Sequence, residues 1–252
     1  MTIQTTIADP TTGTTGHRWL VNDDVAPGAL GMLATLVLAD GTDMPDEVLG
    51  MESAAILLSG TATWHGDERL LHPGDGVFSP AGSPCPLTAT SDSTRLLLIY
   101  GRQVYGRQGN SGGMPVNAGV CWRYVVAGQQ TDPTLAATGG FADMGVRWLA
   151  TSDTVGSSSL VVATSTFSPA GHHALHRHPH ADEFFLIVDG GGQHLAPPGP
   201  IRMGPGDLVF VPAGEWHGYR TDPDTATTAI YGYLGAGSLA QAGYELDQGR
   251  VD

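Results

Sequence analysis

Residues 171–190 read Gly-His-His-Ala-Leu-His-Arg-His-Pro-His-Ala-Asp-Glu-Phe-Phe-Leu-Ile-Val-Asp-Gly, and this stretch decides the fold. His176 and His178 stand two residues apart, so on a β-strand both side chains point to the same face. Glu183 opens the apolar run that follows, and His217 comes after the next Pro-x-Gly corner. Three imidazoles and one carboxylate that converge inside a barrel form a site for one divalent transition metal, with positions left open for substrate, water or dioxygen.

The same succession of strands and turns occurs twice along the chain. Gly60 and Gly190, which each follow an apolar strand, lie 130 residues apart. Pro80 and Pro212, which each begin a Pro-Ala-Gly corner, lie 132 residues apart. Short strands rich in Val, Leu and Phe, separated by Gly and Pro, are typical of sandwiches and barrels rather than of alternating βαβ units. The nearly constant offset indicates a duplicated all-β unit.

The composition excludes several classes of function. The chain has 252 residues, a formal net charge of -14 and 11 cationic side chains, all of them arginine. Without lysine there is no Schiff-base chemistry and no phosphate-binding lysine, and the sparse cations disfavour a nucleic-acid partner. No apolar stretch is long enough to span a membrane, and the first 16 residues lack the features of a signal peptide, so we expect a cytoplasmic protein with no membrane partner.

Both histidine-bearing motifs resemble those of the cupin superfamily. The first cupin motif, HxH, four residues, Glu, six residues and Gly, is matched by His176, His178, Glu183 and Gly190. The second, Gly, five residues, Pro-x-Gly, two residues and His, is matched by Gly206, Pro212, Gly214 and His217. The resemblance implies an all-β fold of two tandem cupin domains, that is, double-stranded β-helix or jelly-roll barrels. The four predicted metal ligands are His176, His178, Glu183 and His217.

The two halves differ in their residues at the metal positions. The expected division is an N-terminal tail over 1–18, an N-terminal cupin without a metal site over 19–104, an interdomain connection over 105–143, and a C-terminal metal-binding cupin over 144–252. Aligned through the glycines, the first half has Asp46, Val48, Ser53 and Cys85 where the second has its ligands. Valine cannot coordinate a metal and serine is a poor ligand, so we expect a structural role for the first cupin. A rival second site would draw on Asp46, Glu47, Glu52, His65 or Cys85, whose spacing does not converge.

Over the whole chain, this pairing of a ligand-poor and a metal-binding cupin is distantly similar to the bicupin ureidoglycine aminohydrolases. That family has Glu, His, His and Gln at the four positions, so its ligand set differs. The three-His, one-Glu set resembles that of cupin dioxygenases such as quercetinases, of oxalate-degrading enzymes, and of several isomerases and lyases. Resemblance to bicupins also implies a homodimer.

From these observations we expect a mononuclear metal-dependent bicupin enzyme acting on a small organic metabolite, with a dioxygenase favoured. A non-redox hydrolase, isomerase or lyase is the first alternative, and a non-catalytic small-molecule-binding cupin is the second. The cofactor is expected to be one divalent ion per chain, Fe, Mn or Ni ahead of Zn, Co or Cu, because this donor set accepts all of them.

Further site residues follow from strand alternation and nearness to the ligands. Tyr219 is predicted to be catalytic, and the predicted substrate-binding residues are Phe185, Phe210 and Trp216. Packing in the barrel core is the alternative for Phe185 and Phe210. Solvated surface positions are the default expectation for Arg202 and Arg220, with anchoring of a substrate carboxylate as the alternative. The remaining nearby histidines, for which we expect surface positions, are His172, His173 and His180.

Overall fold

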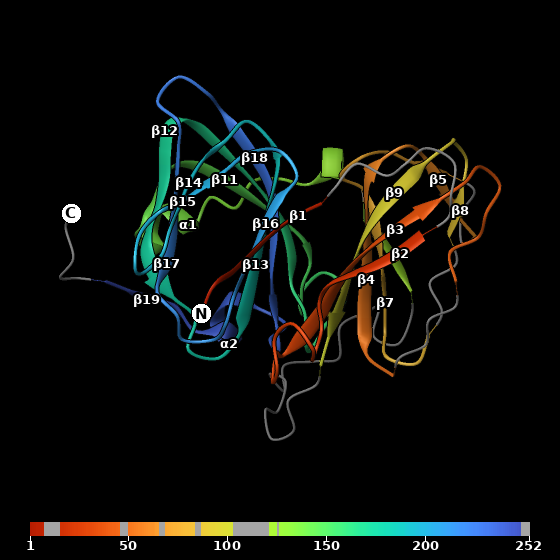
Figure 1. The fold of residues 1–252 in the computed structure, drawn as a ribbon, viewed down its shortest axis with the longest axis horizontal. Coiled ribbons are helices and arrows are strands. Elements are labelled where there is room, and N and C mark those ends of the chain that lie inside the picture. The colour runs from red at the N-terminus through yellow and green to blue at the C-terminus, as the bar shows by residue number, and fades with distance from the viewer. Residues whose placement is uncertain are drawn as a thin grey trace.

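Two lobes of β-strands, one from each half of the sequence, lie side by side in the computed structural model (Figure 1). The structure describes residues 1–7, 16–45, 50–65, 69–83, 87–102, 121–124 and 126–247. In the described residues, helical structure is limited to the short segments α1 (Leu135–Thr138), α2 (Leu239–Ala242) and a 3-10 turn at Val126–Gly128. The prediction of an all-β fold is confirmed.

The N-terminal lobe contains one larger and one smaller sheet. The larger sheet has the order β10-β7-β4-β9-β3-β2 and the smaller has the order β6-β5-β8. The bounds of these strands are β2 (Gly16–Val21), β3 (Gly31–Leu38), β4 (Glu52–Ser59), β5 (Ala62–Trp64), β6 (Leu70–Leu71), β7 (Gly76–Ser79), β8 (Leu87–Ala89), β9 (Thr94–Gly101) and β10 (Trp122–Tyr124).

The C-terminal lobe is one curled sheet with the order β1-β16-β13-β18-β12-β17-β14-β15, with β11 and β19 also paired to β12. Its strands are β1 (Ile3–Thr6), β11 (Phe141–Ala150), β12 (Val162–Arg177), β13 (Asp182–Asp189), β14 (Gly192–Leu195), β15 (Ile201–Met203), β16 (Asp207–Val211), β17 (His217–Thr221), β18 (Thr227–Leu234) and β19 (Glu245–Leu246). Long β12 bends so that it pairs with β18 through its first half and with β17 through its second.

Both faces of β13 are buried from Asp182 to Ile187, which explains the apolar run that begins at Phe184. Phe185 and Ile187 point into a core enclosed by the C-terminal sheet, which we call the barrel core. Phe184 and Leu186 point the other way, into a core shared with residues of the first lobe such as Ile56. The strand that carries Glu183 is therefore held from both sides.

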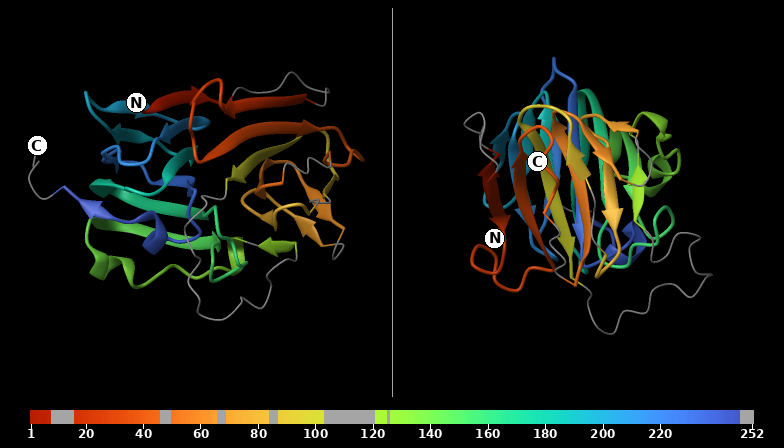
Figure 2. Two further views of the ribbon diagram at one scale, coloured as in Figure 1. Left: turned by 90° about the horizontal axis from the view of Figure 1, so that it is seen from below. Right: turned by 90° about the vertical axis from the view of Figure 1, so that its right-hand side faces the viewer.

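The first strand belongs to the lobe made by the second half of the chain. Within residues 1–18, where the sequence predicts a tail, β1 pairs antiparallel with β16, with Ile3 opposite Phe210 (Figures 1 and 2). This pairing joins residues about 200 positions apart, and four residues, Ile-Gln-Thr-Thr, carry too little pattern to reveal it. Of the predicted connection over 105–143, residues 105–120 and 125 lie outside the described residues, and β10 pairs with β7 of the first lobe.

The glycine that ends the first cupin motif has a double steric requirement. Gly190 has a φ of +80°, and a Cβ atom there would lie 2.1 Å from the carbonyl oxygen of Ala226. Gly214 has a nearly identical φ of +81°, but open space surrounds its missing Cβ. Substitutions at these two glycines therefore distinguish the cost of backbone strain from the cost of steric overlap.

We expect Gly190→Ala to lower the free energy of unfolding by about 3 kcal/mol, and Gly214→Ala by only about 1 kcal/mol. Both variants force alanine into a left-handed conformation, but only the first also drives a methyl group into backbone atoms. Urea unfolding followed by circular dichroism measures both values. Equal losses in the two variants would contradict the steric argument.

Candidate metal centre

The four predicted ligands come together from neighbouring parts of the C-terminal sheet. β12 and β17 pair so that His176 lies opposite His217, and His178 follows directly after the end of β12. Glu183 is the second residue of β13, which begins after a short turn. The potential ligand atoms of all four residues lie within 4.8 Å of one another, and all four side chains are buried. Among the described residues, no second group of this kind is found.

Hydrogen bonds on the far side of each ring determine which nitrogen faces the cluster. In each of the three histidines, Nδ1 contacts a backbone carbonyl oxygen. The acceptors are the carbonyls of Ala174, Gly243 and Glu215, at 2.7, 2.5 and 2.9 Å from Nδ1 of His176, His178 and His217 respectively. Because a carbonyl oxygen only accepts hydrogen bonds, each Nδ1 carries the proton. In the neutral ring, Nε2 then has a free lone pair.

The resulting donor set fits a cation. Oε2 of Glu183 is 3.1 Å from Nε2 of His178 and 3.1 Å from Nε2 of His217. The Nε2 atoms of His176 and His178 are buried without a hydrogen-bond partner. Three nitrogen lone pairs and a carboxylate that face one another repel unless a positive charge lies among them, and these are the donors that a divalent transition metal accepts.

Burial and neighbouring charges set the protonation of the cluster. Burial holds the pKa of His176 well below its ordinary value. Burial alone would raise the pKa of Glu183, but the charge and hydrogen bonds of the adjacent rings of His217 and His178, when these rings are protonated, hold it well below its ordinary value. A charged carboxylate beside a neutral imidazole is the protonation state that metal binding requires.

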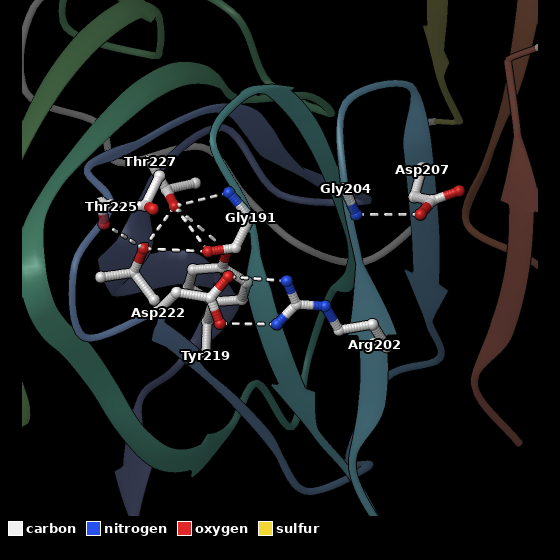
Figure 3. Close-up of polar contacts among 9 residues, drawn as sticks. Gly191, Arg202, Gly204, Asp207, Tyr219, Asp222, Thr225 and Thr227 are labelled. Atoms are coloured by element: carbon white, nitrogen blue, oxygen red, sulfur yellow. Dashed lines mark hydrogen bonds and ion pairs between the residues drawn. The ribbon is translucent and has the colours of Figure 1, made fainter.

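Phe185 and Tyr219 lie in the barrel core, on the faces predicted from strand alternation. The ring of Tyr219 packs against Phe167 and Phe185, with centroids 5.0 and 4.9 Å away. Its hydroxyl donates to Oγ1 of Thr227 at 3.4 Å, in a polar cluster with the backbone of Gly191 (Figure 3). No contact links the Tyr219 hydroxyl to the four clustered residues, so its catalytic role stays a prediction.

Phe210 is on the opposite side of the sheet from the cluster. It pairs with Phe184, and both belong to the core shared by the lobes, whereas Glu183 pairs with Val211 and faces the barrel core. Residues directly opposite each other in an antiparallel pair share a face, so the structure does not bring Phe210 to the cluster. Trp216 is half-buried, and the guanidinium carbon of Arg177 lies 4.8 Å from its ring centroid.

The optional arginine anchors are not directed to the cluster. Arg202 forms a two-pronged ion pair with Asp222, with N–O distances of 2.5 and 2.6 Å (Figure 3). Arg220 is exposed on β17, where alternation places it on the other face from His217 and Tyr219. Neither arginine therefore brings a positive charge next to the four clustered residues.

His173 differs from its predicted surface position. His172 and His180 are exposed as expected, but His173 is half-buried and stacks on His176 with ring centroids 3.8 Å apart. Its Nε2 contacts the hydroxyl of Tyr244 at 3.1 Å. A register shift in β12 between His173 and His176 is the reason, because the irregularity turns two residues of opposite parity to the same side.

Three further residues near the cluster were not singled out from the sequence. Tyr233 lies opposite Glu183 on β18, with its ring 4.5 Å from that of His178. Tyr244, which precedes β19, lies 5.2 Å from the ring of His176. His194 is buried on β14, and its ring is 6.0 Å from that of His217. Strand alternation applied to β18 and β14 would have indicated Tyr233 and His194, whereas Tyr244 had no sequence signal.

His194 gives the metal-free protein a specific dependence on acid. Burial lowers the pKa of His194 from 6.5 to about 3. Between these values the unfolded chain binds a proton that the folded chain rejects, so the free energy of unfolding falls as the pH drops from about 6.5 towards 3, by up to about 1.4 kcal/mol per unit. Urea unfolding at pH 7 and pH 5 should show a larger loss for wild type than for His194→Phe; equal losses would contradict the assignment.

The first lobe has a pocket where the second has its ligands. Ser53, which aligns with Glu183, lines an open pocket of about 410 Å³, counting space open to solvent, together with Leu36 and Tyr100. Ser53 pairs with Tyr100 across β4 and β9, as Glu183 pairs with Tyr233 across β13 and β18. The other three aligned positions lie outside the described residues, and so does Glu47 of the rival site. These three positions are Asp46, Val48 and Cys85.

Comparisons with known proteins show which fold the chain shares. Residues 163–231 match the family model described as "Cupin domain", so the C-terminal lobe carries a cupin domain, and the chain has the fold of two tandem cupins. Among solved structures it is similar to a mutant of Bacillus subtilis oxalate decarboxylase OxdC, with 14% identity, a TM-score of 0.67, and coverage of 92% of this chain and 77% of that one.

Two further comparisons extend this result. Protein Ylba from E. coli is 15% identical with a TM-score of 0.65, covering 91% of this chain and 86% of that one. Dimethylsulfoniopropionate lyase DddQ of Ruegeria pomeroyi is 39% identical over 66 residues, which are 25% of this chain and only 32% of the relative. No described helix has the length and apolar character needed to cross a membrane.

Proposed function

We propose that this protein is a mononuclear metal-dependent enzyme that cleaves a bond of a small organic carboxylate. One observation carries the proposal: three Nε2 lone pairs and a carboxylate lie within 4.8 Å of one another in a buried site. The proposed ligands are His176, His178, Glu183 and His217. With one divalent ion the site has a net charge of about +1, which favours an anionic substrate.

For the ion, we propose Mn²⁺ first, with Fe²⁺ and Ni²⁺ next. Imidazole and carboxylate donors accept all three, so the donor set alone does not choose among them. Support for manganese comes from similarity to a structure of Bacillus subtilis oxalate decarboxylase, a protein with Mn(II) centres, at 14% identity and a TM-score of 0.68. When bound, the ion supplies Lewis acidity to a substrate oxygen.

The chain itself holds the ligands and keeps water away from them. The carbonyls of Ala174, Glu215 and Gly243 orient the three imidazoles, and such supporting hydrogen bonds tune metal affinity. Burial raises the pKa of Tyr233 and of Tyr244, so both phenols stay protonated at neutral pH. Because the site is buried among neutral side chains, the attraction between a bound divalent ion and an anionic substrate would be stronger than in water.

Two chemistries compete for the reaction itself. Bond cleavage without dioxygen is supported by the names of the relatives, a dimethylsulfoniopropionate lyase and oxalate decarboxylases, which both denote action on a carboxylate. The dioxygenase expected from the sequence is the second candidate, favoured because four ligands leave positions free for substrate and dioxygen side by side. For the first lobe we propose a structural role, and for the assembly a homodimer.

The test begins with elemental analysis of protein purified without a His-tag. We expect one divalent ion per chain, and protein that binds none would overturn the metalloenzyme. Turnover of oxalate, dimethylsulfoniopropionate and other small carboxylates is then compared in air and under strict anaerobiosis. Unchanged anaerobic turnover supports cleavage without dioxygen, whereas loss of turnover with stoichiometric oxygen uptake in air supports the dioxygenase. If the protein turns over none of these compounds, and the Glu183→Ala variant still binds a ligand, a binding protein would be favoured.

A further inference from the structure

His194 is a buried polar residue that the proposed ligand set does not use. Its side chain lies in the C-terminal lobe with a relative exposure of 2%, and its Nε2 is buried without a hydrogen-bond partner. We propose that His194 is a substrate-binding residue of the metal centre, whose imidazole donates a hydrogen bond to an oxygen of a small carboxylate held there. This inference rests on the proposed function and adds a residue to its site.

The strand pairing places His194 on the interior side of the sheet. β14 and β17 are neighbours in the C-terminal lobe (Figure 1), and His194 lies directly opposite Tyr219, which packs in the barrel core. The rings of His194 and His217 are nearly parallel, 12° apart, with centroids separated by 6.0 Å. His194 is not part of the group whose atoms lie within 4.8 Å, so it is beside the metal cluster rather than a member of it.

The other interior histidines of this lobe have partners that explain them. Each of the three proposed histidine ligands has a carbonyl at Nδ1 and turns Nε2 to the cluster, and His173 contacts the hydroxyl of Tyr244. His194 has no comparable partner. An unpaired polar atom in a core costs free energy that an apolar side chain of similar size avoids, so such an atom calls for a partner that arrives from outside.

The chemistry of this side of the barrel points to an anionic oxygen as that partner. A divalent ion at the cluster leaves a net charge of about +1 nearby, which draws a carboxylate. A carboxylate has two oxygens, so one can face the ion while the other accepts from a ring N–H. The competing donors are committed, since the hydroxyl of Tyr219 donates to Thr227 and the guanidinium of Arg202 pairs with Asp222 (Figure 3).

Oxalate binding to the Mn²⁺-loaded protein tests the inference. Isothermal titration gives the dissociation constant of oxalate, and elemental analysis gives the manganese content of each variant. We expect His194→Phe to keep one Mn²⁺ per chain and to weaken oxalate binding about tenfold or more. His194→Gln, which restores an N–H at similar reach, should recover most of the affinity. His172→Phe replaces an exposed histidine of the same sheet, so its manganese content and oxalate affinity should match those of wild type.

A second measurement does not depend on any variant folding. In Zn²⁺-loaded wild type labelled with ¹⁵N-histidine, oxalate should shift the ring nitrogen signals of His194 and leave those of exposed His172 in place. Unchanged His194 signals at saturating oxalate would overturn the inference, as would wild-type oxalate affinity in His194→Phe. Loss of manganese from a folded His194→Phe would also overturn it, because the residue would then hold the ion.

The two proposals fail in different ways. A wild-type protein that holds Mn²⁺ but binds no oxalate contradicts the role of His194 and leaves the metal centre standing. A wild-type protein that holds no divalent ion contradicts the metal centre itself.

Discussion

Glu183→Gln is expected to lower the affinity for a divalent metal by roughly 100-fold or more. Glutamine keeps the size of the side chain but removes the one negative charge of the cluster, and its amide presents N–H groups to imidazoles that need to face a cation. Groups that only orient a ligand already change metal affinity by roughly 10–100-fold, so losing a charged ligand should cost at least as much. Elemental analysis and competition with a chelator measure the change.

The matched control lies on the same strand. Asp189 ends β13 as an exposed carboxylate, so Asp189→Asn removes the same charge from the same element without touching the cluster. We expect Asp189→Asn to bind metal as wild type does. Retention of one tightly bound ion per chain by Glu183→Gln would remove Glu183 from the ligand set.

The second large effect concerns the contact between the lobes. Glu52, at the start of β4, is buried, and its carboxylate accepts the backbone N–H groups of Ser158 and Ser159 at 2.8–3.0 Å. The hydroxyls of Ser157, Ser158 and Ser159 also lie within 2.7–2.9 Å of it. These serines precede β12, so one side chain of the first lobe satisfies the donors of a whole turn in the second.

We expect Glu52→Ala to lower the free energy of unfolding by about 3–5 kcal/mol, because it leaves several buried donors unpaired and opens a cavity. Glu52→Gln should lose less, since one amide oxygen still accepts while the amide nitrogen opposes a backbone N–H. Asp24→Ala, at an exposed position, should stay within about 0.5 kcal/mol of wild type. Urea unfolding gives all three values, and a loss below about 1 kcal/mol in Glu52→Ala would show that the turn is satisfied without Glu52.

Local patterns were sufficient wherever the chemistry depends on neighbours in sequence. A period of two puts His176 and His178 on one face, and the apolar run after Glu183 forms a strand buried on both sides. Positive-φ glycines mark the turns that set the spacing of both motifs, and Gly190 and Gly214 show them in the structure. The four residues therefore converge as their spacing predicted.

Alternation failed wherever the strands are irregular or the pairing is remote. The register shift in β12 brings His173 onto His176, which no count of residues reveals. Phe210 has the right kind of side chain, but its pairing with Phe184 turns it to the shared core. For Tyr219 alternation gave the correct face, but it does not reveal that the hydroxyl donates to Thr227.

By itself, the sequence determined the all-β architecture, the duplication and the identity of four residues able to hold one ion, because these depend on short-range periodicity and on the chemistry of side chains. Only the tertiary structure decided which nitrogen of each imidazole faces the cluster, since the carbonyls that orient the rings include Gly243 from a distant segment. It also decided that Glu52 joins the lobes and that His194 lies buried and unpaired beside His217. Burial and hydrogen-bond partners are properties of the folded chain, because they arise between segments that the sequence keeps far apart.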